Sequence, residues 1–205
     1  MYLNTDNVND KLTSLITYNT NTTSNNIPKL YIDQVAFISF SSNENGSILY
    51  TNNSIIVTLS NCVFANNTAN NGGSVYFNNT INSTITISDC QFTKNTANIY
   101  GGAIYFDSNI FSINIISSKF YDNTANIGGG AIFLHSNTKN IKILDTEFIS
   151  NKQLKQSTNP VLGGGAIYFL KNLHELIYIY NSTFISNTAA SFGITLITIL
   201  KPLLQ

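Results

Sequence analysis

The chain has few charged side chains. Only 10% of its 205 residues are charged, against about 25% in ordinary domains, and ten basic residues cancel ten acidic ones. A neutral chain lacks the electrostatic footprint that nucleic acid or an anionic membrane requires, so we expect no nucleic-acid partner. Solubility must come from the plentiful Asn, Ser and Thr. The apolar content of 43% is enough for a substantial core.

Long apolar runs are also missing. The N-terminal sequence MYLNTDNVND has no basic start followed by an apolar run, so it predicts no signal peptide. The stretch from Phe192 to Leu200 is far shorter than the roughly 18 residues that a membrane span needs. The sequence stops at KPLLQ directly after a strand-like run, and we therefore expect a fragment of a longer protein.

Residues that bind metals are scarce. Two cysteines do not identify a redox compartment, and the two histidines, His135 and His174, fall at different places in the sequence pattern. We expect no zinc site, no other metal and no cofactor.

Repetition is what the sequence has in abundance. NTANIYGGAIYF (95–106) returns as NTANIGGGAIFL (123–134). The Phe that opens each F-x-x-N motif recurs every 28 residues (92 − 64, 120 − 92, 148 − 120), and then after 36 (184 − 148), at Phe64, Phe92, Phe120, Phe148 and Phe184. Phe37 is a weaker first copy, with Phe40 at the Asn position. The longer last step contains an insertion at about 152–162.

Two β-rich runs lie in each repeat. Before each Phe, apolar and polar residues alternate, as in Ile85-Thr86-Ile87, which is typical of a strand with one buried face. A second run, such as AIYF, follows each glycine pair. Two or three short strands per 28-residue coil predict an all-β fold, a parallel β-helix of about six coils, with like residues about 4.8 Å apart. We assign residues 30–205 to it and residues 1–29 to a cap or a disordered segment.

Several residue types recur at one position of each coil. We predict a structural asparagine ladder, with a sugar-binding row as the alternative, at Asn67, Asn95, Asn123, Asn151 and Asn187. Tight turns, where φ must be positive or a side chain would clash, are expected at Gly73, Gly102, Gly130, Gly165 and Gly193. Cys62 and Cys90 also share a position, and they form either a disulfide or a pair of stacked free thiols.

The motif pair resembles a known family. FTKNTANIYGGAI (92–104), FYDNTANIGGGAI (120–132), and FISN (148–151) with GGAI (164–167) resemble the repeats of the chlamydial polymorphic outer-membrane proteins, within the pectate-lyase-like β-helix superfamily. The resemblance implies a right-handed helix, a cell-surface or extracellular location, and adhesion. The partners that it implies are a host or neighbouring-cell surface protein or glycan, and a continuation of the same solenoid.

Catalytic residues are harder to find. Carbohydrate-active enzymes need carboxylates clustered within about 5 to 10 Å. Asp89 and Asp145 share one position two coils apart, and Asp107 and His135 share another on neighbouring coils. No nucleophile or arginine accompanies them in the pattern, so we predict no enzyme. A carbohydrate-active enzyme remains the alternative if these four residues share a concave surface.

The insertion is the most individual feature of the chain. Loops that project from a rigid scaffold often carry binding specificity, so Lys152 and Lys155 mark a candidate binding loop, with a neutral insertion as the alternative. We expect a non-catalytic surface or secreted segment with a structural or adhesive role. The missing export signal leaves an intracellular scaffold as a further alternative.

Overall fold

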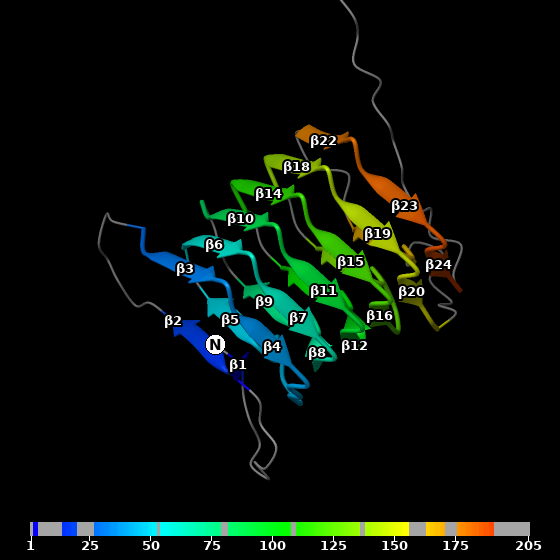
Figure 1. Ribbon diagram of the computed structural model, residues 1–205, viewed down its shortest axis with the longest axis horizontal. Helices are drawn as coiled ribbons and strands as arrows, with labels where there is room; N and C mark the ends of the chain where they lie inside the picture. The colour runs from blue at the N-terminus through cyan, green and yellow to red at the C-terminus, as the bar shows by residue number, and fades with distance from the viewer. Residues whose placement is uncertain are drawn as a thin grey trace, which may run out of the picture.

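The computed structural model describes residues 2–3, 14–19, 27–52, 54–78, 82–107, 110–135, 138–155, 163–170 and 176–190. In this part of the chain four parallel sheets run along a β-solenoid, with the first coils at one end and β22 and β23 at the other (Figure 1). Two of the predicted features, Gly193 and most of the insertion, lie outside the described residues. The handedness stays a prediction from the resemblance.

The sheets are named A to D, and each contains the equivalent strand of successive coils. Sheet A contains β1 (Tyr2–Leu3), β4 (Ala36–Ile38), β7 (Val63–Ala65), β11 (Gln91–Thr93), β15 (Lys119–Tyr121), β19 (Glu147–Ile149) and β23 (Thr183–Ile185). Sheet B contains β2 (Ile16–Asn19), β5 (Leu49–Asn52), β9 (Val75–Asn78), β13 (Ile104–Phe106), β17 (Ile132–Leu134) and β21 (Ile167–Phe169). Sheet C contains β3 (Lys29–Asp33), β6 (Ile56–Ser60), β10 (Thr84–Ser88), β14 (Ser112–Ile116), β18 (Asn140–Leu144) and β22 (Leu176–Tyr180). Sheet D contains β8 (Thr68–Asn71), β12 (Thr96–Tyr100), β16 (Thr124–Ala125), β20 (Lys152–Gln153) and β24 (Thr188–Ala189).

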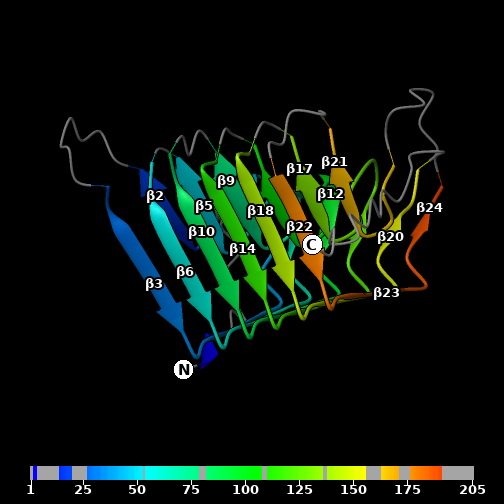
Figure 2. The same cartoon turned by 90° about the horizontal axis from the view of Figure 1, so that it is seen from above.

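The predicted fold class and repeat are confirmed. The six strands of sheet C lie side by side, one from each coil, as Figure 2 shows from above. Register follows the 28-residue period, so Ile85 lies opposite Val57 on one side and Ile113 on the other. A coil holds up to four strands, one more than the largest number predicted, because only two polar residues separate the short strands of sheets A and D. The strands β1 and β2 add to sheets A and B within the segment that we assigned to a cap.

The polar residues between strands turn the chain through single left-handed residues. The corner from sheet C to sheet A has positive φ at Gln34, Asn61, Asp89, Ser117, Asp145 and Asn181. The corner from sheet A to sheet D has it at Ser39, Asn66, Lys94, Asp122, Ser150 and Ser186. Short polar side chains, Asn and Asp above all, tolerate this conformation best, which explains ten of these twelve residues; the exceptions are Gln34 and Lys94.

The corner from sheet D to sheet B contains the glycine pair, and each of its two positions requires glycine for a different reason. The first, as in Gly101, has positive φ, here 64°. The second, as in Gly102, lies against the next coil, and a Cβ there would stand 2.1 Å from the carbonyl oxygen of Gly130. Gly73, Gly130 and Gly165 are equally crowded by backbone atoms. The predicted reasons for glycine, positive φ and a clash, are therefore both present, on adjacent residues.

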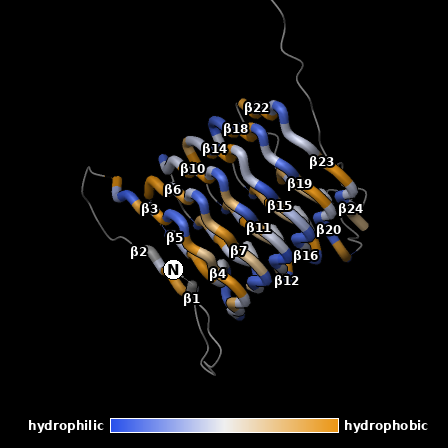
Figure 3. Tube along the Cα trace, viewed as in Figure 1, coloured by the Kyte–Doolittle hydropathy of each residue, from blue (hydrophilic) through white to orange (hydrophobic). Residues whose placement is uncertain are grey.

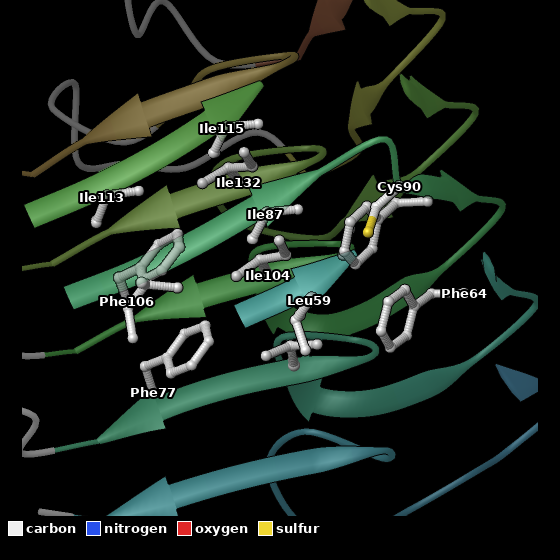
Figure 4. Close-up of a cluster of buried hydrophobic side chains, with 14 of the residues drawn as sticks. Leu59, Phe64, Phe77, Ile87, Cys90, Ile104, Phe106, Ile113, Ile115 and Ile132 are labelled. Carbon is white, nitrogen blue, oxygen red and sulfur yellow. The ribbon is translucent and has the colours of Figure 1, made fainter. Parts of the chain in front are cut away.

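The core lies between the sheets. Hydropathy alternates along the strands (Figure 3), and the apolar residues point inward, where Ile113 and Ile115 of sheet C face Ile104 and Phe106 of sheet B (Figure 4). The F-x-x-N phenylalanines form one stack along sheet A. Their ring centroids are 4.6 to 5.2 Å apart from Phe37 to Phe184. These distances match the strand spacing, so in-register pairing itself places the rings in contact.

The asparagine ladder is confirmed, and it lies inside the protein. Asn67, Asn95, Asn123 and Asn151 are fully buried. The Oδ1 of Asn123 accepts hydrogen bonds from the backbone N–H and the Nδ2 of Asn95, both at 3.0 Å. The Nδ2 of Asn123 donates to Phe92 O at 2.9 Å and to Asn151 Oδ1 at 2.9 Å. The last member is Asn187, whose Oδ1 accepts from Asn151. Burial removes the basis for the sugar-binding alternative.

We predict that Asn123→Ala lowers the free energy of unfolding by about 3 kcal/mol or more, because several buried polar groups lose their partner at roughly 1 to 3 kcal/mol each. The matched control is Asn98→Ala. Asn98 belongs to a second, exposed row in which its Nδ2 donates to Asn70 Oδ1, so its loss should cost less than about 0.5 kcal/mol. Urea denaturation measures the free energy of unfolding of both variants. Equal losses in the two variants would contradict the stabilising role of the buried ladder.

A second prediction concerns the glycine pair. Gly102→Ala should lower the unfolding free energy by about 3 kcal/mol, because its Cβ meets backbone atoms of the next coil that cannot move aside independently. Gly128→Ala is the control, since its Cβ would meet the ring of Phe133 at 3.0 Å and the nearest backbone atom, the carbonyl oxygen of Gly163, only at 3.4 Å, and its φ is not positive. Thermal unfolding followed by circular dichroism should separate the two variants. A Gly102→Ala protein as stable as the control would show that the coils can spread apart.

Candidate functional site

The two cysteines belong to a column of hydrogen-bonding side chains at the corner between sheets C and A. Both are free and buried, so the stacked-thiol alternative describes them. Each thiol donates to the carbonyl oxygen two residues earlier, Cys62 to Ser60 at 3.0 Å and Cys90 to Ser88 at 3.2 Å. In later coils hydroxyls make the same bond, at Ser118, Thr146 and Ser182. The thiols therefore take the place of hydroxyls in a structural column.

The contact between the two thiols makes them unequal. Hydrogen bonding to Cys90 lowers the pKa of the Cys62 thiol to about 7, and the same contact, together with burial, raises the pKa of the Cys90 thiol. The pair therefore loses one proton well before the other. Burial of both sulfurs keeps the resulting thiolate away from large reactants.

The aspartates and the histidine that could have formed a catalytic centre lie in two separate places. Asp89 and Asp145 are exposed corner residues that follow strands of sheet C. Asp107 and His135 lie before such strands, on the connection from sheet B to sheet C. A five-residue strand, roughly 17 Å long, separates the two places. The convergence that would support a carbohydrate-active enzyme is therefore missing for these four residues.

Asp107 and His135 do meet, as their shared repeat position predicts. His135 Nδ1 and Asp107 Oδ1 are 3.0 Å apart, and both side chains are partly exposed. Two tyrosine hydroxyls donate hydrogen bonds to the same carboxylate. The Tyr76 hydroxyl is 2.8 Å from Asp107 Oδ2, and the Tyr105 hydroxyl is 3.3 Å from Asp107 Oδ1. Burial, with the hydrogen bond to Asp107, raises the pKa of Tyr76, and burial, with the charge of Asp107, raises that of Tyr105. The tyrosines therefore stay protonated and act as donors that hold Asp107 in place.

These tyrosines are part of an aromatic column that the sequence reasoning missed. On the outer face of sheet B the rings stack with centroids 4.9 to 5.5 Å apart, at Tyr50, Tyr76, Tyr105, Phe133 and Tyr168. Four of these five residues form a buried cluster of their own, separate from the main core. The signal was present in the sequence, because an aromatic residue follows the core Ile or Val of each second β-run.

The described part of the candidate binding loop ends at Lys155. Lys152 and Lys155 are both exposed at its base, and residues 156–162 lie outside the described residues. Between the two lysines, Gln153 is buried where other coils have Ala69, Ala97, Ala125 and Ala189. Its Nε2 donates to Asn126 O at 2.9 Å and to the carbonyl oxygen of Lys155. Gln153 thus ties the start of the loop to the preceding coil, and its polarity in an alanine column was the overlooked signal.

No metal centre is evident in the described part of the chain. No three His, Cys, Asp or Glu side chains there gather into a group that could hold an ion. The same residues include no helix long and apolar enough to cross a bilayer.

Comparison with known families supports the repeat assignment. The family model of the Chlamydia polymorphic membrane protein repeat matches residues 89–107 and 117–134. These two stretches are similar to polymorphic membrane protein repeats. Each match begins at a left-handed corner and ends at, or one residue after, a strand of sheet B, so that it covers β11, β12 and β13 in one coil and β15, β16 and β17 in the next. No curated protein and no solved structure gives a significant match.

The hydroxyl column yields a third prediction. Cys90→Ser should unfold within about 1 kcal/mol of the unchanged protein, because serine makes the same bonds in later coils, whereas Cys90→Ala should lose roughly 1 to 3 kcal/mol as the Cys62 N–H loses its acceptor. Urea unfolding under reducing conditions compares the two variants. Equal losses for serine and alanine would mean that packing, not hydrogen bonding, decides this position.

Proposed function

We propose that this chain is a non-catalytic repeat segment of a surface or secreted protein, with a structural and adhesive role. The observation that carries the proposal is the pair of matches to a repeat named after membrane proteins, in a stack whose coils are held together by buried hydrogen bonds. Such a stack is rigid along its axis, and rigidity suits a segment that presents a binding surface at a distance.

The surface of the solenoid is consistent with a passive scaffold that carries a local binding feature. On β10 and β14, in the middle of sheet C, five of the six outward positions are Thr, Ser or Asn, as in Thr84, Thr86 and Asn114, and the sixth is Ile116. The partner that we propose is a surface protein or glycan of a host or neighbouring cell, and its contact is the loop based on Lys152 and Lys155. Two lysines within four residues favour a partner with acidic groups.

Binding to cells tests this proposal. Microspheres coated with the chain should bind a panel of cells, including the source cells, at least fivefold better than spheres coated with albumin. Lys152→Ala combined with Lys155→Ala should remove most of the excess. The control, Lys94→Ala combined with Lys119→Ala, removes the same charge from exposed positions beside and on sheet A and should bind as before.

Enzymatic treatment of the cells identifies the partner class. Loss of binding after protease treatment indicates a protein partner, and loss after glycosidase treatment indicates a glycan. Binding no better than albumin would contradict adhesion, and a loss equal to that of the control variant would exclude the loop.

A further inference from the structure

The last strand of sheet C differs from the others on its outer face. Outward positions on β10 are Thr84, Thr86 and Ser88, but on β22 all three are large and apolar. Leu176, Tyr178 and Tyr180 are 48%, 44% and 57% exposed. Three such side chains on one short strand form an apolar surface of the kind that marks a protein–protein contact.

The same strand is the edge of sheet C in the last described coil. Among the described residues, β22 pairs only with β18. The inward-facing Ile177 and Ile179 are only partly buried, whereas Ile141 and Ile143 on β18 are 1% exposed. The strand carries no charge, proline or bulge, which are the usual means by which proteins protect a sheet edge from pairing. Among the described residues, no strand covers the free backbone edge of β22 or the end of the core beside it.

The sequence of β22, LIYIY, is complementary to itself. If two copies pair antiparallel about Tyr178, then Leu176 faces Tyr180 of the other copy on the outside, and Ile177 faces Ile179 on the inside. Every cross-strand pair is apolar, and such pairs stabilise a sheet by about 0.2 to 1 kcal/mol each beyond Ala–Ala. Among the described residues the nearest lysines are Lys142 on each β18, and they would be three strand intervals or roughly 14 Å apart, beyond the screening length of about 8 Å at physiological salt.

Stacking of the last coil onto the first coil of another copy is blocked. If β22 paired with β3 of a second copy in register, β23 would have to lie beside β4 of that copy. That place is taken by β1, which already pairs with β4, and β2 similarly occupies the edge of β5. The two ends of the solenoid are therefore unlike.

We propose that two copies of this chain associate end to end through antiparallel pairing of β22 with β22, which joins their C sheets into one. The contact is isologous, so it closes at a dimer and does not continue into a filament. This inference goes beyond the proposed adhesive role and does not depend on it.

Sedimentation and cross-linking test the dimer. Sedimentation equilibrium should give about twice the chain mass of 22.5 kDa. Tyr178→Lys should weaken the association at least tenfold by placing two ammonium groups side by side. Tyr31→Lys is the control, because Tyr31 occupies the same column on β3, at the other end of sheet C, and is 65% exposed. Circular dichroism of both variants checks that they fold.

The pairing register has its own test. In the proposed dimer the two copies of residue 178 lie on the symmetry axis with Cα atoms about 4.5 to 5.5 Å apart, within the range that a disulfide spans. Tyr178→Cys should therefore form a covalent dimer when oxidised glutathione accepts the two electrons, and Tyr31→Cys should not.

Four outcomes would overturn the proposal. The first is a chain that is monomeric at its highest soluble concentration. The second is an equal weakening of the association by the two lysine variants, and the third is equal cross-linking of the two cysteine variants. The fourth is an assembly whose mass keeps increasing with protein concentration. The last result would indicate head-to-tail stacking instead, and the first would indicate that residues of the same chain cover β22. None of these outcomes bears on adhesion through the loop at Lys152 and Lys155.

Discussion

Buried amide hydrogen bonds between coils are the constraint on which the rest of this solenoid depends. Each central asparagine satisfies its side chain almost entirely with groups of the coils before and after it. A shift in register would leave these amides buried without partners, and a shift of one residue would also turn the inward face outward. The ladder therefore specifies one register, and the phenylalanine stack and the glycine contacts follow from that register.

In-register stacking also accounts for the low charge of the chain. A charged residue repeated in every coil would stand about 4.8 Å from its copies and repel them, whereas Asn, Thr, Phe and Ala can stack on themselves. Where charges do occur in a column, their neighbours are neutral or opposite. Lys94 lies between Asn66 and Asp122, and Lys119 pairs with Glu147 and Gln91. Neutral composition is thus a property of the architecture.

The sequence predicts the architecture well because the repeat makes each contact visible several times. Period, parallel stacking, the asparagine ladder and the glycine turns could all be recognised from residues that return every 28 positions. Features that occur once could not. Gln153 is a single exception in an alanine column, and the Asp107 contacts with Tyr76 and Tyr105 depend on which face of sheet B is outward. The strands of sheets A and D were hidden because left-handed corners at residues such as Lys94 and Asp122 resemble ordinary loops.

Each coil contacts its neighbours through equivalent atoms, so the gene can gain or lose whole repeats without disturbing these contacts. Recombination between near-identical stretches, such as those coding for residues 95–106 and 123–134, adds or removes a unit of 28 residues. The new junction places Asn on Asn and Phe on Phe, so the protein changes its length without a new folding problem. Extra residues in any other number do not fit the 28-residue register and must leave the stack. Length and loops are therefore the two quantities that can vary freely between lineages, while the cross-section stays fixed.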